Sequence, residues 1–333
     1  MDRGKKIFVL GANSFSGQDF IDIALDNPDY ELIGTSRSKQ GSGAFLSYRL
    51  REDLSRYVYY QIDLNTKMDE LLAILDKERP QWVINFAAQS EVAPSWEHPE
   101  HWFQTNTVVL AKLVNHLRKQ DYLERYLHVS SPEAYGTCTG NVDEKTHYNP
   151  STPYAASKAA ADMLLTTYHQ QYGFPLQIVR ATNVYGARQQ LFKIIPSTII
   201  CIKKKKKIQL HGGGVAIKSY IHIRDVSKGE LAILEKGKIG QIYHLSPSAG
   251  IFIKDLVANI CSRMGVNFED YVEIVAERPG QDKAYLLNSK KASDELGWQP
   301  DISLDTGLSE VVDWIDQYWE YLKQEQLEYI HRE

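Results

Sequence analysis

Residues 7–17 read IFVLGANSFSG, four apolar residues followed at once by a turn that carries glycine and serine. The apolar run is typical of a buried β-strand, and the turn is typical of the start of a helix. A helix that begins behind such a strand presents free backbone N–H groups where the pyrophosphate of a dinucleotide can bind. Ser14 stands where a second glycine would allow closer approach, so a purely structural turn remains an alternative. This motif assigns the following residues to a cofactor: Gly11, Asn13, Ser14, Phe15, Ser16 and Gly17.

Short apolar runs and longer amphipathic segments alternate through the first half of the chain. The apolar runs indicate buried strands, and the segments between them have helical periodicity, as in residues 108–117. Strands that alternate with helices form a parallel sheet, and right-handed crossovers place the helices on both faces. We therefore predict an α/β fold, a doubly wound Rossmann sheet that binds its ligand at the carboxyl ends of the strands. The predicted strands are Ile7–Leu10, Glu31–Thr35, Tyr57–Ile62, Trp82–Ala87, Tyr126–Val129 and Leu176–Val179.

The pattern changes after about Tyr185, where glycine and proline separate shorter elements. We expect residues 1–185 to form the dinucleotide-binding domain, together with residues 219–246. The remainder of 186–333 is expected to form a smaller, mixed α/β domain for the substrate, with helices at Lys254–Met264 and Gly307–Leu322. The lysines of residues 203–207 indicate a solvated helix end in preference to an anion-binding tract.

Composition excludes several classes of protein. The chain has 333 residues, of which 43% are hydrophobic and 24% charged, and its net charge of -4 favours neither nucleic-acid nor membrane binding. Its three cysteines, Cys138, Cys201 and Cys261, have no short spacing, which argues against disulfides and against a zinc site. No apolar run approaches the roughly 20 residues of a membrane-spanning helix. We expect a cytoplasmic protein that holds no metal.

The residues after the second and third predicted strands bear on the choice of cofactor. An NAD site commonly has a carboxylate at the end of the second strand, whereas this chain has Arg37 there. An arginine suits the 2′-phosphate of NADP, so we favour NADP and keep NAD as the alternative. Arg37 stacked on adenine, or turned to solvent, is also compatible with the sequence. Asp63 is a candidate partner of the adenine amino group, or simply a residue that forms a turn.

Tyr154 and Lys158 are four residues apart on a predicted helix and therefore share one face. The ammonium of Lys158 can lower the pKa of the phenol, so that Tyr154 exchanges a proton with a substrate alcohol during hydride transfer. This spacing is common by chance. Its position makes it informative, because Pro153 marks the start of a helix that lies between the fifth and sixth predicted strands.

Ser131 and Glu133 follow the fifth predicted strand, at the edge of the sheet where ligands bind. Ser131 can bind the alcohol oxygen that Tyr154 deprotonates. Glu133, if it is partly desolvated, can remove a proton from a carbon next to a carbonyl group. The alternative is that Glu133 is a loop carboxylate that caps the following turn.

Taken together, these motifs resemble the extended short-chain dehydrogenase/reductases over essentially the whole chain. Within that family the chain looks most like nucleotide-sugar 4,6-dehydratases. Such enzymes oxidise C4 of a nucleotide-activated hexose, eliminate water across C5 and C6, and return the hydride to C6. The segments that carry the resemblance are residues 85–91 (NFAAQSE), 105–107 (TNT), 131–136 (SPEAYG), 154–158 (YAASK), 180–186 (RATNVYG) and 278–282 (RPGQD).

The resemblance implies a role for each matching residue. Tyr154 would be the base at the C4 hydroxyl, supported by Lys158, while Ser131 would hold that oxygen and Glu133 would take the C5 proton. Further cofactor contacts are implied for Leu64, Ala87, Ala88, Asn106, Tyr154 and Lys158. The implied substrate-binding residues are Gln89, Glu91, Asn183, Lys193, Lys218 and Arg278.

The chain departs from the family pattern at Pro132, where many members carry an acid beside the glutamate. Proline cannot protonate a leaving hydroxide, so either Glu133 serves both steps or elimination is lost. An NADPH-dependent reductase of 4-keto-6-deoxy sugars is therefore the main alternative, because the residues around Arg37 look like those of such reductases. A 4-epimerase fits less well, since it has no need of Glu133.

Two roles that involve no catalysis also remain open. The chain could sense a cofactor without catalysis, although intact Ser131, Tyr154 and Lys158 argue against this, or it could act chiefly in assembly. The helices predicted around Phe103–Leu117 and Tyr154–Tyr172 resemble the pair through which the family forms dimers. Burial of their apolar stripes would give a twofold interface in a homodimer. Alternatively, these stripes face only the sheet.

Overall fold

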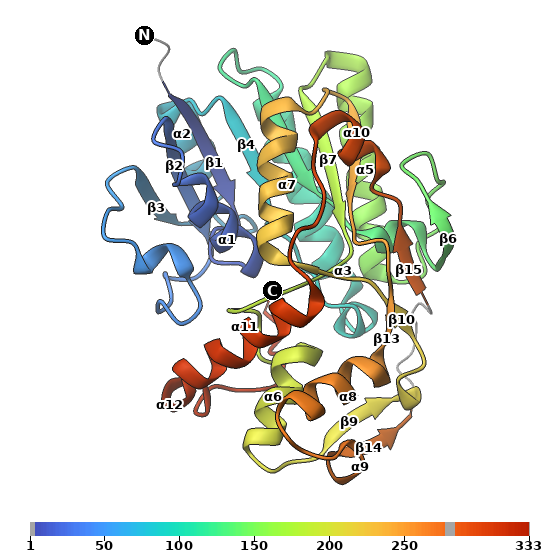
Figure 1. Ribbon diagram of the computed structural model, residues 1–333. Helices are drawn as coiled ribbons and strands as arrows, with labels where there is room; N and C mark the ends of the chain where they lie inside the picture. Colours follow the sequence, from blue (N-terminus) through green and yellow to red (C-terminus); the bar gives the residue numbers. More distant parts are fainter. Residues whose placement is uncertain (1–3, 277–283, 333) are drawn as a thin grey trace.

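The computed structural model describes residues 4–276 and 284–332 (Figure 1). Its centre is a sheet of seven parallel strands in the order β12-β7-β5-β4-β1-β2-β3. All six predicted strands lie in this sheet, so the predicted doubly wound fold is confirmed. The seventh strand, β12, pairs with β7 at one edge. The sheet strands are β1 (Lys5–Leu10), β2 (Tyr30–Ser36), β3 (Tyr57–Gln61), β4 (Trp82–Asn85), β5 (Arg125–Val129), β7 (Leu176–Ala181) and β12 (Gln241–Leu245).

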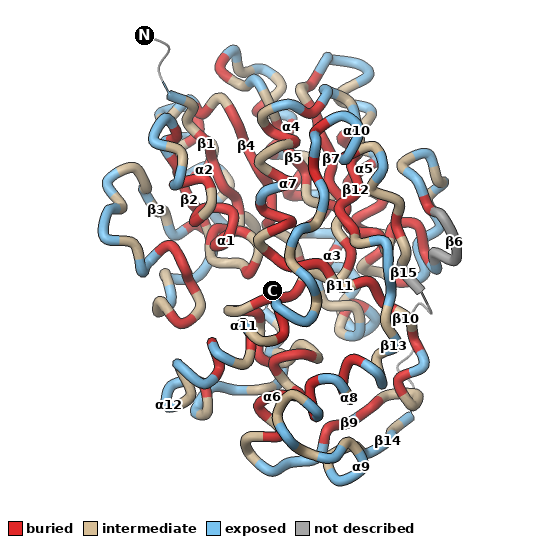
Figure 2. The backbone as a smooth tube through the Cα atoms, in the orientation of Figure 1, coloured by how far each residue is buried: buried red, intermediate tan, exposed pale blue. Residues whose placement is uncertain are grey.

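Helices cover both faces of the sheet because side chains alternate along each strand. In β1, Ile7 and Val9 belong to one core and Phe8 and Leu10 to the other. The first core includes residues of α1 and α7, and the second includes residues of α2, α4 and α5. Figure 2 shows the central strands of this sheet, such as β1, β4, β5 and β7, as mostly buried. These helices are α1 (Phe15–Ala24), α2 (Met68–Glu78), α4 (Leu110–Leu117), α5 (Pro153–Tyr172) and α7 (Ile223–Lys236).

The other strands are short and form three small sheets, in the orders β13-β10-β15-β6, β11-β8 and β14-β9. Most are too short to leave a clear apolar pattern in the sequence, which explains why they were not predicted. Their bounds are β6 (Cys138–Val142), β8 (Asn183–Tyr185), β9 (Ile208–His211), β10 (Ile217–Lys218), β11 (Tyr220–His222), β13 (Ile251–Phe252), β14 (Val272–Val275) and β15 (Ala284–Leu287).

A third core lies below the main sheet in the view of Figure 1, among α6, α8 and α11. The predicted helix at residues 254–264 is present as α8, whereas that at 307–322 is interrupted at Tyr318. The lysine run is a helix end as expected, because α6 ends at Lys203 and Lys205 has φ 53°. The remaining α-helices are α3 (Pro99–Phe103), α6 (Ile194–Lys203), α8 (Ile253–Arg263), α9 (Phe268–Tyr271), α10 (Lys290–Leu296), α11 (Leu304–Gln317) and α12 (Trp319–Leu322).

The chain carries two features that matter for the site. A π-helical turn, η3 (Gln104–Val109), joins α3 to α4, and such turns are frequent at functional sites. A 3₁₀ turn, η4 (Pro132–Tyr135), follows β5. In the described part of the chain, no helix is both long enough and apolar enough to cross a membrane.

Candidate functional site

The glycine turn after β1 is built so that two backbone segments touch. Gly11 has φ 84°, and a Cβ there would lie 2.9 Å from the amide nitrogen of Ala87. A Cβ on Gly17 would lie 2.3 Å from the carbonyl oxygen of Gly11. Ser14 fills the place of the missing second glycine as the N-cap of α1, and its hydroxyl accepts a hydrogen bond from Gly17 N at 3.0 Å.

A cavity of about 270 Å³ lies beside this turn, at the carboxyl ends of β1, β2 and β4. Eight of the residues predicted for the cofactor line it: Gly11, Asn13, Ser14, Arg37, Asp63, Leu64, Ala87 and Ala88. The structure adds lining residues that the sequence analysis did not assign to the cofactor: Thr35, Ser36, Ser38, Ile62, Asn65, Phe86, Gln89 and Thr105. Phe15, Ser16 and Gly17 are not among the lining residues, because they belong to the first turn of α1, and Phe15 is buried in the fold.

Two predicted cofactor contacts have structural partners of their own. The side-chain amide of Asn13 donates to the carbonyl of Ser38 and to the hydroxyl of Tyr59, each at 3.0 Å. Asn106 is buried, accepts from the backbone N–H of Gln89 at 2.8 Å, and donates to the backbone carbonyl of Gln89 at 3.0 Å. Asn106 therefore positions Gln89 and is not among the residues that line the cavity.

Tyr154 lies in the first turn of α5, with its phenol near the residues that follow β5. Burial raises its pKa, the negative charge of Glu133 raises it further, and a hydrogen bond with Ser131 acts in the opposite direction. The side chains of Ser131, Glu133 and Tyr154 therefore lie close to one another. The hydroxyl of Ser131 also accepts from the backbone N–H of Glu133 at 3.2 Å.

Lys158 is one turn further along α5 and is almost completely buried. Its ammonium donates to the carbonyl of Val129 at 2.7 Å and lies 3.4 Å from Nε2 of His128. Burial lowers its pKa to about 8, against the attraction of Asp162. The sequence analysis expected Lys158 to lower the pKa of Tyr154, but here the ammonium is engaged by the carbonyl at the end of β5.

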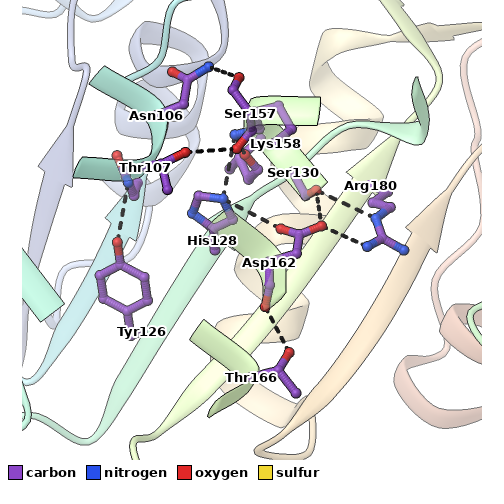
Figure 3. Close-up of polar contacts among 12 residues, drawn as sticks. Asn106, Thr107, Tyr126, His128, Ser130, Ser157, Lys158, Asp162, Thr166 and Arg180 are labelled. Atoms are coloured by element: carbon purple, nitrogen blue, oxygen red, sulfur yellow. Dashed lines mark hydrogen bonds and ion pairs between the residues drawn. The ribbon is translucent and has the colours of Figure 1, made fainter. Parts of the chain in front are cut away.

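Behind Lys158 lies a buried polar network that the sequence analysis did not identify (Figure 3). Asp162 accepts from the guanidinium of Arg180 at 2.7 Å and from the hydroxyl of Ser130 at 2.5 Å. Its other carboxylate oxygen lies 3.6 Å from Nε2 of His128. Burial and the charges of Lys158 and Arg180 lower the pKa of His128 well below its usual value, so this imidazole is neutral.

Two features of the sequence could have predicted this network. Asp162 lies four residues after Lys158, on the same face of α5. Arg180 is the one charged residue inside strand β7, and it is completely buried. A buried arginine needs a charged partner, and α5 supplies that partner in Asp162.

The residues predicted to bind the substrate differ from one another in their surroundings. Lys193 and Glu91 form an ion pair of 2.7 Å with each other. The side chain of Asn183 donates to the carbonyl of Ser219 at 3.1 Å, and Lys218 is buried in β10. Arg278 lies outside the described residues.

Comparison with known proteins agrees with this geometry. The sequence profile of the GDP-mannose 4,6 dehydratase family matches residues 8–311. A dTDP-glucose 4,6-dehydratase of Xanthomonas campestris pv. campestris is 32% identical over 268 residues, which are 74% of this chain and 76% of the relative. The chain belongs to the GDP-mannose 4,6-dehydratase family, among the nucleotide-sugar-modifying members of the extended short-chain dehydrogenase/reductases.

Solved structures of nucleotide-sugar enzymes match nearly the whole chain. The dTDP-glucose 4,6-dehydratase of Streptomyces venezuelae, crystallised with NAD, matches with a TM-score of 0.87 and 28% identity over 95% of this chain and 98% of that one. A UDP-glucuronic acid 4-epimerase of Bacillus cereus, crystallised with UDP-glucuronic acid and NAD, matches with a TM-score of 0.85 and 25% identity over 94% and 99% of the two chains.

Proposed function

We propose that this chain is a nucleotide-sugar 4,6-dehydratase, which converts an NDP-hexose to an NDP-4-keto-6-deoxyhexose. One observation carries the proposal: Glu133 lies close enough to Tyr154 for its charge to raise the pKa of the phenol, and Ser131 hydrogen-bonds to the same phenol. A base for oxidation and a carboxylate for elimination therefore face one space. A 4-epimerase, as named for one structural neighbour, needs the phenol but not the carboxylate.

The cavity beside Gly11 is the proposed site of a nicotinamide dinucleotide. Its residues fit this group, because the cavity borders the Gly11 turn that leads into the N-terminus of α1, where free backbone N–H groups can bind a pyrophosphate. A bound nicotinamide supplies the acceptor of the hydride from C4 and, later, its donor to C6. The solved dehydratase and epimerase neighbours are described with NAD.

NADP is the form that we propose, because Arg37 lies in the cavity wall at the end of β2. The one acid among the residues that line this cavity is Asp63. It follows β3 and not β2, where an NAD site commonly has its carboxylate. If Arg37 binds the 2′-phosphate, Arg37→Ala will weaken NADP binding and leave NAD binding nearly unchanged. Equal losses for the two cofactors would place Arg37 elsewhere and favour NAD.

Three side chains of the protein have separate roles in the proposed reaction. Tyr154 takes the proton of the C4 hydroxyl while Ser131 holds that oxygen, and Glu133 then takes the C5 proton. Pro132, at the first position of η4, has no proton to give. Glu133 is therefore the group that returns its proton to the hydroxide leaving C6, so one carboxylate removes the elements of water.

The diphosphate is proposed to lie near Asn183, Lys193, Lys218 and Arg278. Lys193 is paired with Glu91, so a phosphate that binds this ammonium must compete with a carboxylate 2.7 Å away. Gln89 and Glu91 come from the segment after β4, and Asn183 begins β8. The proposed division places the dinucleotide on residues 1–185 with 219–246, and most of the substrate contacts on the rest.

The chain is further proposed to act as a homodimer in the cytoplasm. Four large apolar side chains are exposed along η3 and α5 or at their ends: Phe103, Val108, Met163 and Tyr172. Their positions agree with a twofold interface formed by this pair of helices. Among the residues whose side chains are described, Cys201 and Cys261 are free thiols, as expected in a reducing compartment.

A panel of GDP-, dTDP-, UDP- and CDP-hexoses, incubated without added oxidant or reductant, tests the activity. A dehydratase converts many substrate molecules per bound cofactor, and mass spectrometry detects the loss of one water. Tyr154→Phe is the matched control and should turn over at least about 10²-fold more slowly, with the cofactor still bound. Conversion that requires one NADPH for each product would identify a reductase instead.

A further inference from the structure

A cluster of metal-ligating side chains lies outside the proposed catalytic site, where the chain enters α3. Nδ1 of His98 lies 3.9 Å from Oε1 of Glu100, and Nε2 of His101 lies 3.7 Å from the same oxygen. One ligand atom from each residue can be chosen so that all three lie within 4.8 Å of one another. The sequence analysis considered metal sites only through cysteine spacing and therefore missed this cluster.

The C-terminal tail, defined here as residues 324–332, returns to this cluster from the other end of the chain. The ring of His331 lies parallel to those of His98 and His101, with centroids 5.3 and 5.1 Å away. It also stacks beside the buried ring of Trp102 at 5.1 Å. Nε2 of His331 lies 2.8 Å from Nδ1 of His101, which is hydrogen-bonding distance.

The same tail reaches the rim of the proposed cofactor cavity. The backbone carbonyl of Arg332 accepts from the side chains of Gln89 at 2.6 Å and Arg37 at 3.1 Å, and both of these residues line the cavity. Tyr329 packs edge-on against Phe192, at a centroid distance of 5.5 Å. Figure 1 shows the C-terminus in the middle of the molecule, between the main sheet and the helices below it.

We propose that His98, Glu100 and His101 bind a divalent transition-metal ion of the zinc type, and that this ion fastens the C-terminal tail across the cofactor cavity. Two imidazoles and a carboxylate are ordinary zinc ligands, and a fourth position would be left for water. Bonds of about 2.0–2.2 Å in tetrahedral geometry separate the ligand atoms by roughly 3.3 Å. The two separations of 3.7 and 3.9 Å from Glu100 and the separation of the two imidazole nitrogens, which is within 4.8 Å, must contract on binding, and the side chains of His98 and Glu100 are exposed enough to move.

His101 links the metal to the tail through its two ring nitrogens. Nε2 faces Glu100 and Nδ1 faces His331. When Nε2 binds a metal, the proton of a neutral imidazole must lie on Nδ1, and the ring then donates to Nε2 of His331. A bound ion therefore fixes the tautomer that holds the tail, and a docked tail strengthens the binding of the ion by the same factor.

The consequence for the cofactor follows from the position of Arg332, and this step rests on the proposed dinucleotide site. The backbone carbonyl of Arg332 accepts hydrogen bonds from the side chains of Arg37 and Gln89 at the cavity. A dinucleotide that enters or leaves the cavity must therefore displace the tail. Metal binding should therefore slow cofactor exchange. The metal site itself does not depend on that step and is tested without any cofactor.

Zinc binding by the metal-stripped full chain, measured against a chromophoric chelator, is the first test. We expect one site per chain in the wild type and at least a tenfold weaker site in His98→Ala and in Glu100→Ala. His147→Ala removes an exposed histidine outside the cluster and should bind as the wild type does. Equal zinc binding by wild type and His98→Ala, or no stoichiometric binding by the wild type, would overturn the site.

The tail is tested by trimming with a serine carboxypeptidase, which needs no metal of its own, followed by mass spectrometry. Zinc should slow the trimming of the wild type several-fold and leave that of His98→Ala unchanged. His331→Ala should bind zinc several-fold more weakly, because it loses the linked hydrogen bond. Trimming that zinc does not affect, in a protein that binds zinc at His98, would refute the link to the tail while leaving the metal site standing.

Discussion

At the scale of single residues, burial shifts the pKa values of Tyr154 and Lys158, and the charge of Glu133 shifts that of Tyr154 further. The phenol is uncharged in the absence of ligands, because burial and the carboxylate of Glu133 both oppose its ionisation. Lys158 is almost completely buried, and burial lowers its pKa to about 8.

Replacing Glu133 by glutamine should separate oxidation from elimination. The variant keeps the size of the side chain and a carbonyl oxygen, but it cannot accept the C5 proton. We expect product formation to fall by about 10²–10⁴-fold while reduced cofactor accumulates on the enzyme. Absorbance of the reduced nicotinamide and the mass of the product report the two steps. Unchanged product formation would remove Glu133 from the elimination.

The pH dependence of kcat/KM should follow Lys158. The charged form is the one that holds the carbonyl of Val129, so activity should fall as the pH rises through about 8. Asp162 raises the pKa of Lys158, and Asp162→Asn removes that attraction. The alkaline limb of the profile should therefore move to lower pH in Asp162→Asn. A limb that stays in place would show that another group controls it.

At the scale of elements, the buried pair of Asp162 and Arg180 joins α5 to β7 beneath the catalytic residues. Both side chains are completely buried, so removal of one partner leaves an uncompensated charge. Asp162→Ala should lower the free energy of unfolding by about 3–5 kcal/mol, as measured with urea. The matched control is Asp121→Ala, which breaks an exposed pair with Arg79 and should cost at most about 1 kcal/mol. Equal losses in the two variants would contradict this account.

The sequence predicts some elements far better than others, for physical reasons. Most strands of the main sheet are buried on both faces and therefore appear as apolar runs, and the predicted limits of all six predicted strands fall within about two residues of the observed ones. Strands such as β10, with two residues, leave no such pattern. The break at Tyr318 and the π-helical turn η3 depend on packing that periodicity does not reveal.

The candidate site also has some features that the sequence predicts and others that it does not. The turn at Gly11 and the Ser131, Glu133 and Tyr154 cluster were predictable, because short motifs and strand ends fix their positions. The use of Asn106 to hold Gln89, and of Lys158 to hold Val129, was not predictable, because each depends on a contact between distant segments. The contact of Arg332 with Arg37 joins residues 295 positions apart.

At the scale of the whole molecule, the proposed homodimer predicts which surface substitution matters. Met163→Glu places a charge on the exposed face of α5, where the second protomer should pack. It should yield monomers in sedimentation velocity at a concentration where the wild type is dimeric. Ile274→Glu changes an even more exposed apolar residue on β14 and should remain dimeric. If both variants were monomeric, or if both remained dimeric, the result would argue against this interface.

The most direct test of the proposed reaction uses an NDP-hexose that is accepted as substrate and carries deuterium at C4. The enzyme should release a 4-keto-6-deoxy product that has lost water and retains the label at C6, with no net consumption of cofactor, because the hydride moves internally. Mass spectrometry and NMR of the product locate the label. Product with no deuterium at C6, or conversion only with stoichiometric NADPH, would contradict the assignment of a dehydratase.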